Sequence, residues 1–203
     1  AKDVERASDL SGLSAKIAAM NAGEAAVFMG EALSIALEDG TRILAPLGGD
    51  LIDPGLSEAE AVRALEPLFR SAKKLYVHDV KRWLSLGARM PGEVHDVMLA
   101  AYVLNPQRKK FTLEAIAADD GVPLDEAAPA ATMLPIGRNQ EEMMREQALA
   151  DLFWQVEMPL ASVLAEMERV GFLTDATELS ALGAQFSEQI DALTRQIHEY
   201  AGL

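Results

Sequence analysis

The side chains in this sequence that could bind a metal ion are almost entirely carboxylates. The chain has no cysteine, which excludes disulfides and thiolate metal sites. Its three histidines are too scattered to indicate a zinc site: His78, His95 and His198. Aspartate and glutamate together number 32, and their oxygens are the ligands that Mg²⁺ prefers. Any metal chemistry is therefore expected to depend on carboxylates.

Basic residues offer little sign of a nucleic-acid surface. The formal net charge is −14, whereas phosphates bind through lysine and arginine. The local basic clusters have no aromatic residues between them, and solvated surface is the favoured interpretation: Lys73-Lys74, Lys81-Arg82 and Arg108-Lys109-Lys110. The pair Gly48-Gly49 lacks the Lys-Ser/Thr that follows in a phosphate-binding loop. Weak or absent DNA binding is expected for this chain alone.

Composition indicates a folded domain with an ordinary core. Half of the 203 residues are hydrophobic and a quarter are charged, so disorder is not expected. No run of 18 or more apolar residues suggests a membrane span. The segment AKDVERASDL at residues 1–10 is not expected to be a signal peptide. A cytoplasmic location is predicted.

Strand signals are concentrated in the first half of the chain. Residues 25–31 read as a strand, and residues 32–47 as two strands around the hairpin signal Asp39-Gly40. A fourth strand is expected at residues 74–77. These four strands and the helices between them predict an α/β fold, with a mixed sheet and helices packed on it.

Helix signals occur throughout the chain. Ser57 and Glu60 form a predicted capping box at the start of one helix, and Asp79 and Thr112 are expected to cap two others. A long loop is expected at residues 122–137, followed by helix to the end of the chain with breaks at Pro159 and Gly171. The expected helices before that loop are 9–22, 57–71, 79–87, 93–106 and 111–121.

The region from residue 156 is expected to form a C-terminal helical hairpin. Its second helix, at about 175–201, carries apolar residues at helical spacing, and such a stripe requires a partner. We expect self-association through this helix or mobile distal turns. The stripe consists of Leu179, Leu182, Phe186, Ile190, Leu193, Ile197 and Tyr200.

Three segments stand in order along the chain: KLYVHDVKRWL (74–84), EVHDVMLAAYVLNP (93–106) and VEMPLASVLAEMERVGFLTD (156–175). Together with the rest of the chain they resemble bacterial DNA polymerase I, a family A polymerase. The resemblance covers nearly the whole chain, and the final helix is similar to the first long helix of the polymerase domain. It implies a ribonuclease-H-like 3′–5′ exonuclease domain at 1–155 and the N-terminal helices of the polymerase domain at 156–203. The resemblance is strongest in the three segments quoted above.

The resemblance also implies where an exonuclease site would lie. Active members use Asp-x-Glu on the first strand, then Asn-x-x-x-Asp, then Tyr-x-x-x-Asp, and these residues hold two divalent metals about 4 Å apart. The first motif matches Met29 and Glu31, so a thioether replaces the aspartate. In the second motif Asp79 replaces the asparagine and Trp83 replaces the aspartate. The favoured interpretations are a solvated residue for Glu31 and a helix cap for Asp79.

The third motif is the hardest to place. Gln147-x-x-x-Asp151 has the spacing, with glutamine in place of tyrosine, and a surface residue is the favoured interpretation of Asp151. Asp96 matches a position of the family that is not a metal ligand, and it is expected to cap or brace the fold.

These substitutions imply a degenerate exonuclease without metal, which supports a polymerase domain in DNA replication and repair. The parent polymerase would use Mg²⁺ and would reach DNA through its remaining parts. Two alternatives stay open. One is an active metal-dependent exonuclease that uses Glu31, Asp79 and Asp151 in a rearranged site. The other is an acidic helical adaptor protein.

Overall fold

The computed structural model describes residues 3–18, 23–48 and 55–202. It divides into two compact units, Ala1–Arg169 and Val170–Leu203, and each is described by itself below. The domain boundary expected at residue 156 stays a prediction. The end of the helix expected over 9–22 lies outside the described residues, as does Gly49 of the pair Gly48-Gly49.

The first unit is built on a six-stranded mixed sheet with the order β1-β4-β3-β2-β5-β6. Strands β2, β3 and β4 are antiparallel neighbours, whereas β1 runs parallel to β4, and β5 and β6 run parallel to β2. The edge strands β1 and β6 were not among the expected strands. The strands are β1 (Val4–Arg6), β2 (Glu24–Met29), β3 (Ala32–Leu37), β4 (Arg42–Pro46), β5 (Lys74–Val77) and β6 (Glu93–Asp96).

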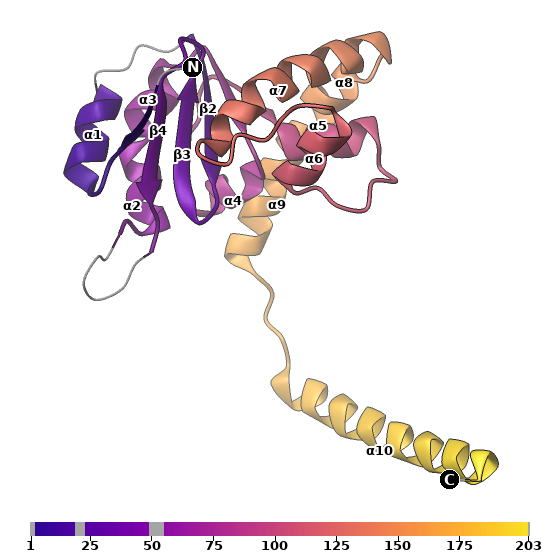
Figure 1. Cartoon of the computed structure of the whole chain (residues 1–203). Coiled ribbons are helices and arrows are strands. Elements are labelled where there is room, and N and C mark those ends of the chain that lie inside the picture. The colour runs from indigo at the N-terminus through magenta and orange to yellow at the C-terminus, as the bar shows by residue number, and fades with distance from the viewer. Residues whose placement is uncertain (1–2, 19–22, 49–54, 203) are drawn as a thin grey trace. The chain divides into compact units, whose positions relative to one another are not determined.

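Helices cover both faces of this sheet (Figure 1). Side chains alternate along each strand, so Val27 and Met29 of β2 pack on one face and Ala26 packs on the other. The first face is covered by α1 (Leu10–Ala18), α2 (Glu58–Ala64), α3 (Glu66–Ser71) and α4 (Val80–Ser85). The second is covered by α5 (Val97–Leu104), α6 (Leu113–Asp119) and α7 (Pro129–Glu146).

Elements with strong local signals lie where the sequence predicts them. Gly40 adopts a positive φ of 85° in the β3–β4 hairpin, as a turn at Asp39-Gly40 requires. Ser57 and Glu60 form the predicted capping box of α2. The helix expected over 57–71 is divided at Leu65, because Pro67 lies in the first turn of α3 and has no N–H for a continuous helix.

The helix expected over 93–106 begins later than predicted. Residues 93–96 form β6, which pairs in parallel with β5, so that Val77 lies opposite Asp96. Pairing along the whole of β5 outweighs the helical pattern of this short segment. The helix itself, α5, starts only after Asp96, whose side chain caps it.

The long loop expected over 122–137 is wrong in its second half, because α7 begins at Pro129. Proline suits the first turn of a helix, where its missing N–H is not needed. Ala128 offers no capping side chain, but Ser34 on β3 accepts a hydrogen bond from the Ala130 N–H at 3.1 Å. A helix start that is capped from a distant strand leaves no local signal.

The helix expected from residue 138 ends at Glu146, and the next helical segment has no break at Pro159. Ala148 adopts a positive φ of 56° between the two segments. The second one runs through α8 (Ala150–Leu152), the π-helix η1 (Phe153–Glu157) and α9 (Met158–Val170). In η1 the N–H of Met158 bonds to the carbonyl of Phe153, and this wide turn accommodates the proline without ending the helix.

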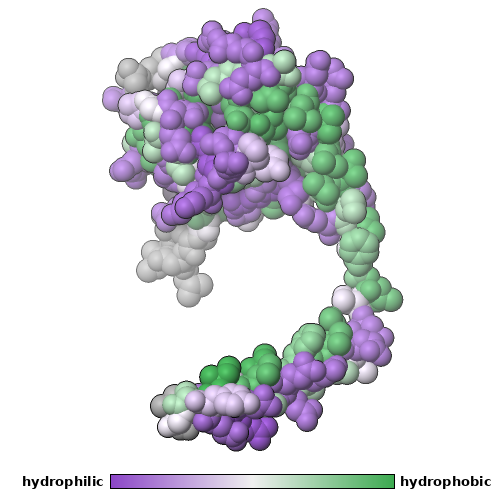
Figure 2. Space-filling view, turned by 90° about the vertical axis from the view of Figure 1, so that its right-hand side faces the viewer, coloured by the Kyte–Doolittle hydropathy of each residue, from purple (hydrophilic) through white to green (hydrophobic). Residues whose placement is uncertain are grey.

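The second unit consists mainly of α10 (Ala176–Ala201), which Asp175 caps and Gly202 ends. The predicted break at Gly171 is confirmed, whereas a pairing of α9 with α10 stays a prediction. Figure 2 shows hydrophobic residues along one side of α10 and hydrophilic residues along the other. No single helix among the described residues is long and apolar enough to cross a membrane; only α7 together with 150–170 reaches that length and composition, bent by 118°.

Candidate functional site

The register aligns the carboxyl ends of the parallel strands β2, β5 and β6 along one border of the sheet. This border, which is distinct from the edge strands β1 and β6, is called the edge below. Val27 of β2 lies opposite Val77 of β5, which lies opposite Asp96 of β6. Met29 and Asp79 each follow two residues after the paired valines. Since ligands of open α/β sheets bind at the carboxyl ends of parallel strands, this edge is the candidate site.

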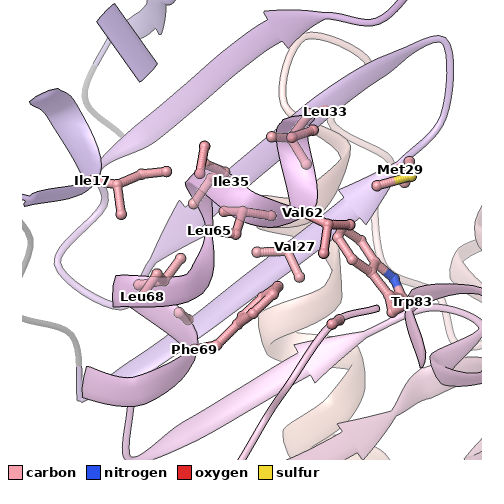
Figure 3. Close-up of a cluster of buried hydrophobic side chains, with 14 of the residues drawn as sticks. Ile17, Val27, Met29, Leu33, Ile35, Val62, Leu65, Leu68, Phe69 and Trp83 are labelled. Atoms are coloured by element: carbon pink, nitrogen blue, oxygen red, sulfur yellow. The ribbon is translucent and has the colours of Figure 1, made fainter. Parts of the chain in front are cut away.

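Met29 belongs to the hydrophobic core at this edge. Its side chain is buried in the cluster formed by the first face of the sheet and the helices above it, as Figure 3 shows. Glu31 follows after Gly30 and is exposed to solvent. The first motif position is therefore filled by a core thioether, and the glutamate beyond it extends from the strand end.

Trp83 is fully buried one turn into α4. Its ring packs edge-on against Phe69 with centroids 6.1 Å apart, and Figure 3 shows it beside Val62 in the same cluster. The indole N–H donates a hydrogen bond to the carbonyl oxygen of His78 at 3.2 Å. The buried indole thus has its polar group satisfied and its carbon atoms in the core.

Asp79 caps α4, as the sequence predicts. Its carboxylate accepts a hydrogen bond from the Arg82 N–H at 3.3 Å. Its φ of 58° lies in the left-handed region, which aspartate tolerates better than most residues. A capping carboxylate at a helix N-terminus accounts for this residue without a metal ion.

Asp96 is the most heavily bonded carboxylate at the edge. It is buried and accepts backbone N–H bonds from Asp79 at 3.1 Å, Val80 at 2.8 Å, Met98 at 2.9 Å and Leu99 at 3.4 Å. Burial raises the pKa of this carboxyl, and the N–H donors act in the opposite direction. Asp96 therefore braces the starts of α4 and α5, the role expected for it.

A guanidinium lies at the end of β2, a feature that sequence reasoning missed. Arg82 donates from Nη1 to the carbonyl oxygen of Met29 at 3.0 Å and pairs through Nη2 with Glu58 at 2.6 Å. Both partners are far from Arg82 in the sequence, and no local pattern could have identified them. The guanidinium therefore joins the end of β2 to α2, and its charge is paired with a carboxylate.

Asp151 lies in α8 and is exposed. Its carboxylate accepts a hydrogen bond from the side-chain amide of Gln155 at 3.1 Å. Within the described parts of the chain, no group of three or more histidine, aspartate or glutamate side chains is placed to share a metal ion. Glu31, Asp79 and Asp151 all lie within these described parts of the chain.

A small apolar cavity of about 160 Å³ lies beside Asp79. It is formed between the starts of α4 and α5 and the side of α9. Its few polar groups include Asp79, Asp96, Lys81 and Glu157. The acids outnumber the single lysine, so the cavity does not favour an anionic ligand.

Most residues of the basic clusters are paired with acids. Lys74 contacts Glu93 and Glu141, each at 2.8 Å. Lys81 contacts Glu168 at 2.7 Å, and Arg108 contacts Asp119 at 3.0 Å. These pairs neutralise charge that a phosphate-binding surface would need.

No family model matches the chain, but individual proteins do. A DNA polymerase I of Chloroflexus aurantiacus is 28% identical over 84% of this chain, and one of Bacillus subtilis is 30% identical over 64%. The thermostable DNA polymerase I of Thermus thermophilus is 33% identical over 73% of it. This chain is related to bacterial DNA polymerase I, of family A. It spans only 21%, 18% and 17% of the three proteins.

Solved structures show a similar fold. The POL domain of Pol1 from M. smegmatis, in complex with DNA primer-template and dNTP, aligns with 95% of this chain and 37% of its own, with a TM-score of 0.67 and 22% identity. Brucella melitensis NrnC aligns with 85% of this chain and 94% of its own, with a TM-score of 0.53 and 13% identity. At these identities the likeness concerns the fold alone.

The relationship to DNA polymerase I bears on two buried residues at the edge, Met29 and Trp83. Met29 and Trp83 stand where the resemblance implies two metal-binding aspartates. Both side chains lie in the core, and neither offers an oxygen. The acids that remain at the edge are a solvated glutamate, a helix cap and a brace.

Proposed function

We propose that this chain is a part of a DNA polymerase I with an inactive 3′–5′ exonuclease domain that supports the polymerase domain. The burial of Trp83 carries this proposal, since its ring occupies core space at a position where an active site needs a carboxylate. The domain would have a ribonuclease-H-like exonuclease fold, consistent with the six-stranded mixed sheet covered on both faces.

Metal chemistry supports an inactive site. Two-metal hydrolysis uses one metal to activate water and another to stabilise the leaving oxygen. Mg²⁺ gives up its hydration reluctantly and requires carboxylate oxygens to do so; a thioether and an indole do not replace them.

The remaining role is architectural, and contact with DNA belongs to the parent polymerase. The net charge of −14 and the pairing of Lys74, Lys81 and Arg108 with acids support weak DNA binding by this chain. The proposal implies replication or repair as the setting and a cytoplasmic location. Mg²⁺ would be a cofactor of polymerisation in parts of the parent outside this chain.

The test is an exonuclease assay with the whole chain. A 5′-labelled single-stranded oligonucleotide is incubated with millimolar Mg²⁺ or Mn²⁺, and shortening from the 3′ end is followed on a gel. No shortening above a metal-free control is expected. Metal-dependent shortening that is lost in Glu31→Ala but kept in the matched surface variant Glu142→Ala would overturn the proposal.

The same assay separates the inactive domain from a rearranged active site. In that alternative, Glu31, Asp79 and Asp151 would share the metals, so Asp79→Asn and Asp151→Asn would each reduce cleavage. Manganese binding measured by electron paramagnetic resonance gives an independent readout. We expect no bound Mn²⁺ that depends on these three residues.

A further inference from the structure

A cluster of buried polar side chains lies on the second face of the sheet, beneath α7. Tyr76 of β5 and His95 of β6 are neighbours in register, with ring centroids 5.5 Å apart. Gln140 and Glu141 face them from α7. Tyr76, His95 and Gln140 are almost completely buried, so each of their polar groups needs a partner within the protein or from water.

Hydrogen bonding fixes which nitrogen of His95 carries its proton. The side-chain amide of Gln140 donates from Nε2 to the carbonyl oxygen of Val97 at 3.0 Å, which turns Oε1 toward His95. That oxygen lies 3.0 Å from His95 Nε2. Since an amide oxygen only accepts, Nε2 must be the protonated nitrogen, and Nδ1 of a neutral ring is then an acceptor.

This tautomer places two acceptors against each other. His95 Nδ1 lies 3.5 Å from Glu141 Oε1, and Glu141 Oε2 already accepts from Lys74. Among the described residues, neither Nδ1 nor Oε1 finds a hydrogen-bond donor. The hydroxyl of Tyr76 is a third buried polar atom without a partner in this part of the chain. Leaving such atoms unpaired is costly.

We propose that one buried water molecule binds between Tyr76, His95 and Glu141. It donates its two hydrogens to His95 Nδ1 and Glu141 Oε1 and accepts the hydrogen of Tyr76 Oη. One molecule thereby satisfies all three atoms, and three hydrogen bonds are the usual number for a buried water. The water would link α7 to β5 and β6 of the sheet.

The surroundings favour water over an extra proton between His95 and Glu141. Burial lowers the pKa of His95; Lys74 acts in the same direction, whereas Gln140, Glu141 and Glu93 act against it. Burial also raises the pKa of Tyr76, helped by Glu141, so the phenol keeps the hydrogen that it donates. Gly137 leaves room for the Tyr76 ring against α7, because a Cβ there would lie 2.2 Å from it.

The tautomer is tested by nuclear magnetic resonance on the ¹⁵N-labelled whole chain at neutral pH. Long-range ¹H–¹⁵N correlations distinguish the two neutral tautomers of His95 from the charged ring. A neutral ring protonated at Nε2 is expected. A charged ring, or a ring protonated at Nδ1, would overturn the proposal. A crystal structure in which no density connects the three atoms would do the same.

The variant Tyr76→Phe tests the water through stability. Removal of the hydroxyl deprives the water of a donor, so the melting temperature is expected to fall. If Tyr76 Oη has no partner, the same change removes an unpaired polar group and the melting temperature rises, which overturns the proposal. Tyr102→Phe is the matched control, since Tyr102 is exposed, and it is expected to leave the melting temperature unchanged.

Discussion

Arg82 donates a hydrogen bond to the backbone carbonyl oxygen of Met29 across the edge of the sheet, at 3.0 Å. The bond joins the first turn of α4 to the end of β2, the two elements to which the resemblance assigns the first two exonuclease motifs. The second guanidinium nitrogen of Arg82, Nη2, pairs with Glu58 on α2. One side chain of α4 thus joins β2 and α2 at this edge.

Trp83→Ala is expected to reduce the free energy of unfolding by roughly 3–5 kcal/mol, because it removes a fully buried ring from the core. Urea denaturation followed by circular dichroism measures the change. Trp83→Phe, which keeps an aromatic ring, is the graded control and should cost less. A loss below about 1 kcal/mol for the alanine variant would show that the ring does not fill the core.

Asp96→Ala is expected to cost about 3 kcal/mol or more, because it leaves four backbone N–H groups, one buried and three partly buried, without their acceptor. Asp96→Asn keeps one oxygen and is expected to lose less. The same denaturation measurement compares the two variants. Equal stability of Asp96→Ala and the unaltered chain would contradict the bracing role.

Stability is expected to fall as the pH drops below about 6.5, the pKa of an unfolded histidine. Burial lowers the pKa of His95 in the folded chain, so between the two pKa values the unfolded state binds more protons. The free energy of unfolding then decreases toward acid, by at most about 1.4 kcal/mol per pH unit for one group.

Urea unfolding at a series of pH values between neutral and mildly acidic measures this effect. The control is His95→Gln, in which the decrease over this range should be weaker. A folded state that becomes more stable on acidification, in a manner that depends on His95, would contradict the expected direction.

The apolar stripe of α10 is expected to cause self-association or to leave the distal turns mobile. Phe186 and Ile190 lie at its centre, and both are more than half exposed. Light scattering over a concentration series measures the mass, and Ile190→Glu should shift it toward the monomer. A strict monomer with strongly protected amides at residues 190–201 would contradict both outcomes.

Elements with local causes could be predicted from the sequence. The β3–β4 hairpin depends on Gly40, and the start of α2 depends on Ser57 and Glu60, all within a few residues of what they control. β6 and the start of α7 have distant causes, namely pairing with β5 and a cap from Ser34. A single sequence carries no local trace of such contacts.

The candidate site divides in the same way. The identities of Met29 and Trp83 could be read at their motif positions, because the resemblance depends on order and spacing. The cap at Asp79 followed from local pattern as well. The bonds of Arg82 with Met29 and Glu58, and the bonds of Asp96 with the N–H groups of Asp79 and Val80, arise only when separate elements meet.

The π-helix η1 has a consequence for the direction in which α9 faces. In an unbroken α-helix, Phe153 and Ala165 would point about 120° apart around the axis, at about 100° per residue. A wide turn that absorbs one residue reduces this difference to about 20°. Both side chains are buried, so the wide turn keeps one buried side of the helix from the start of η1 to the middle of α9.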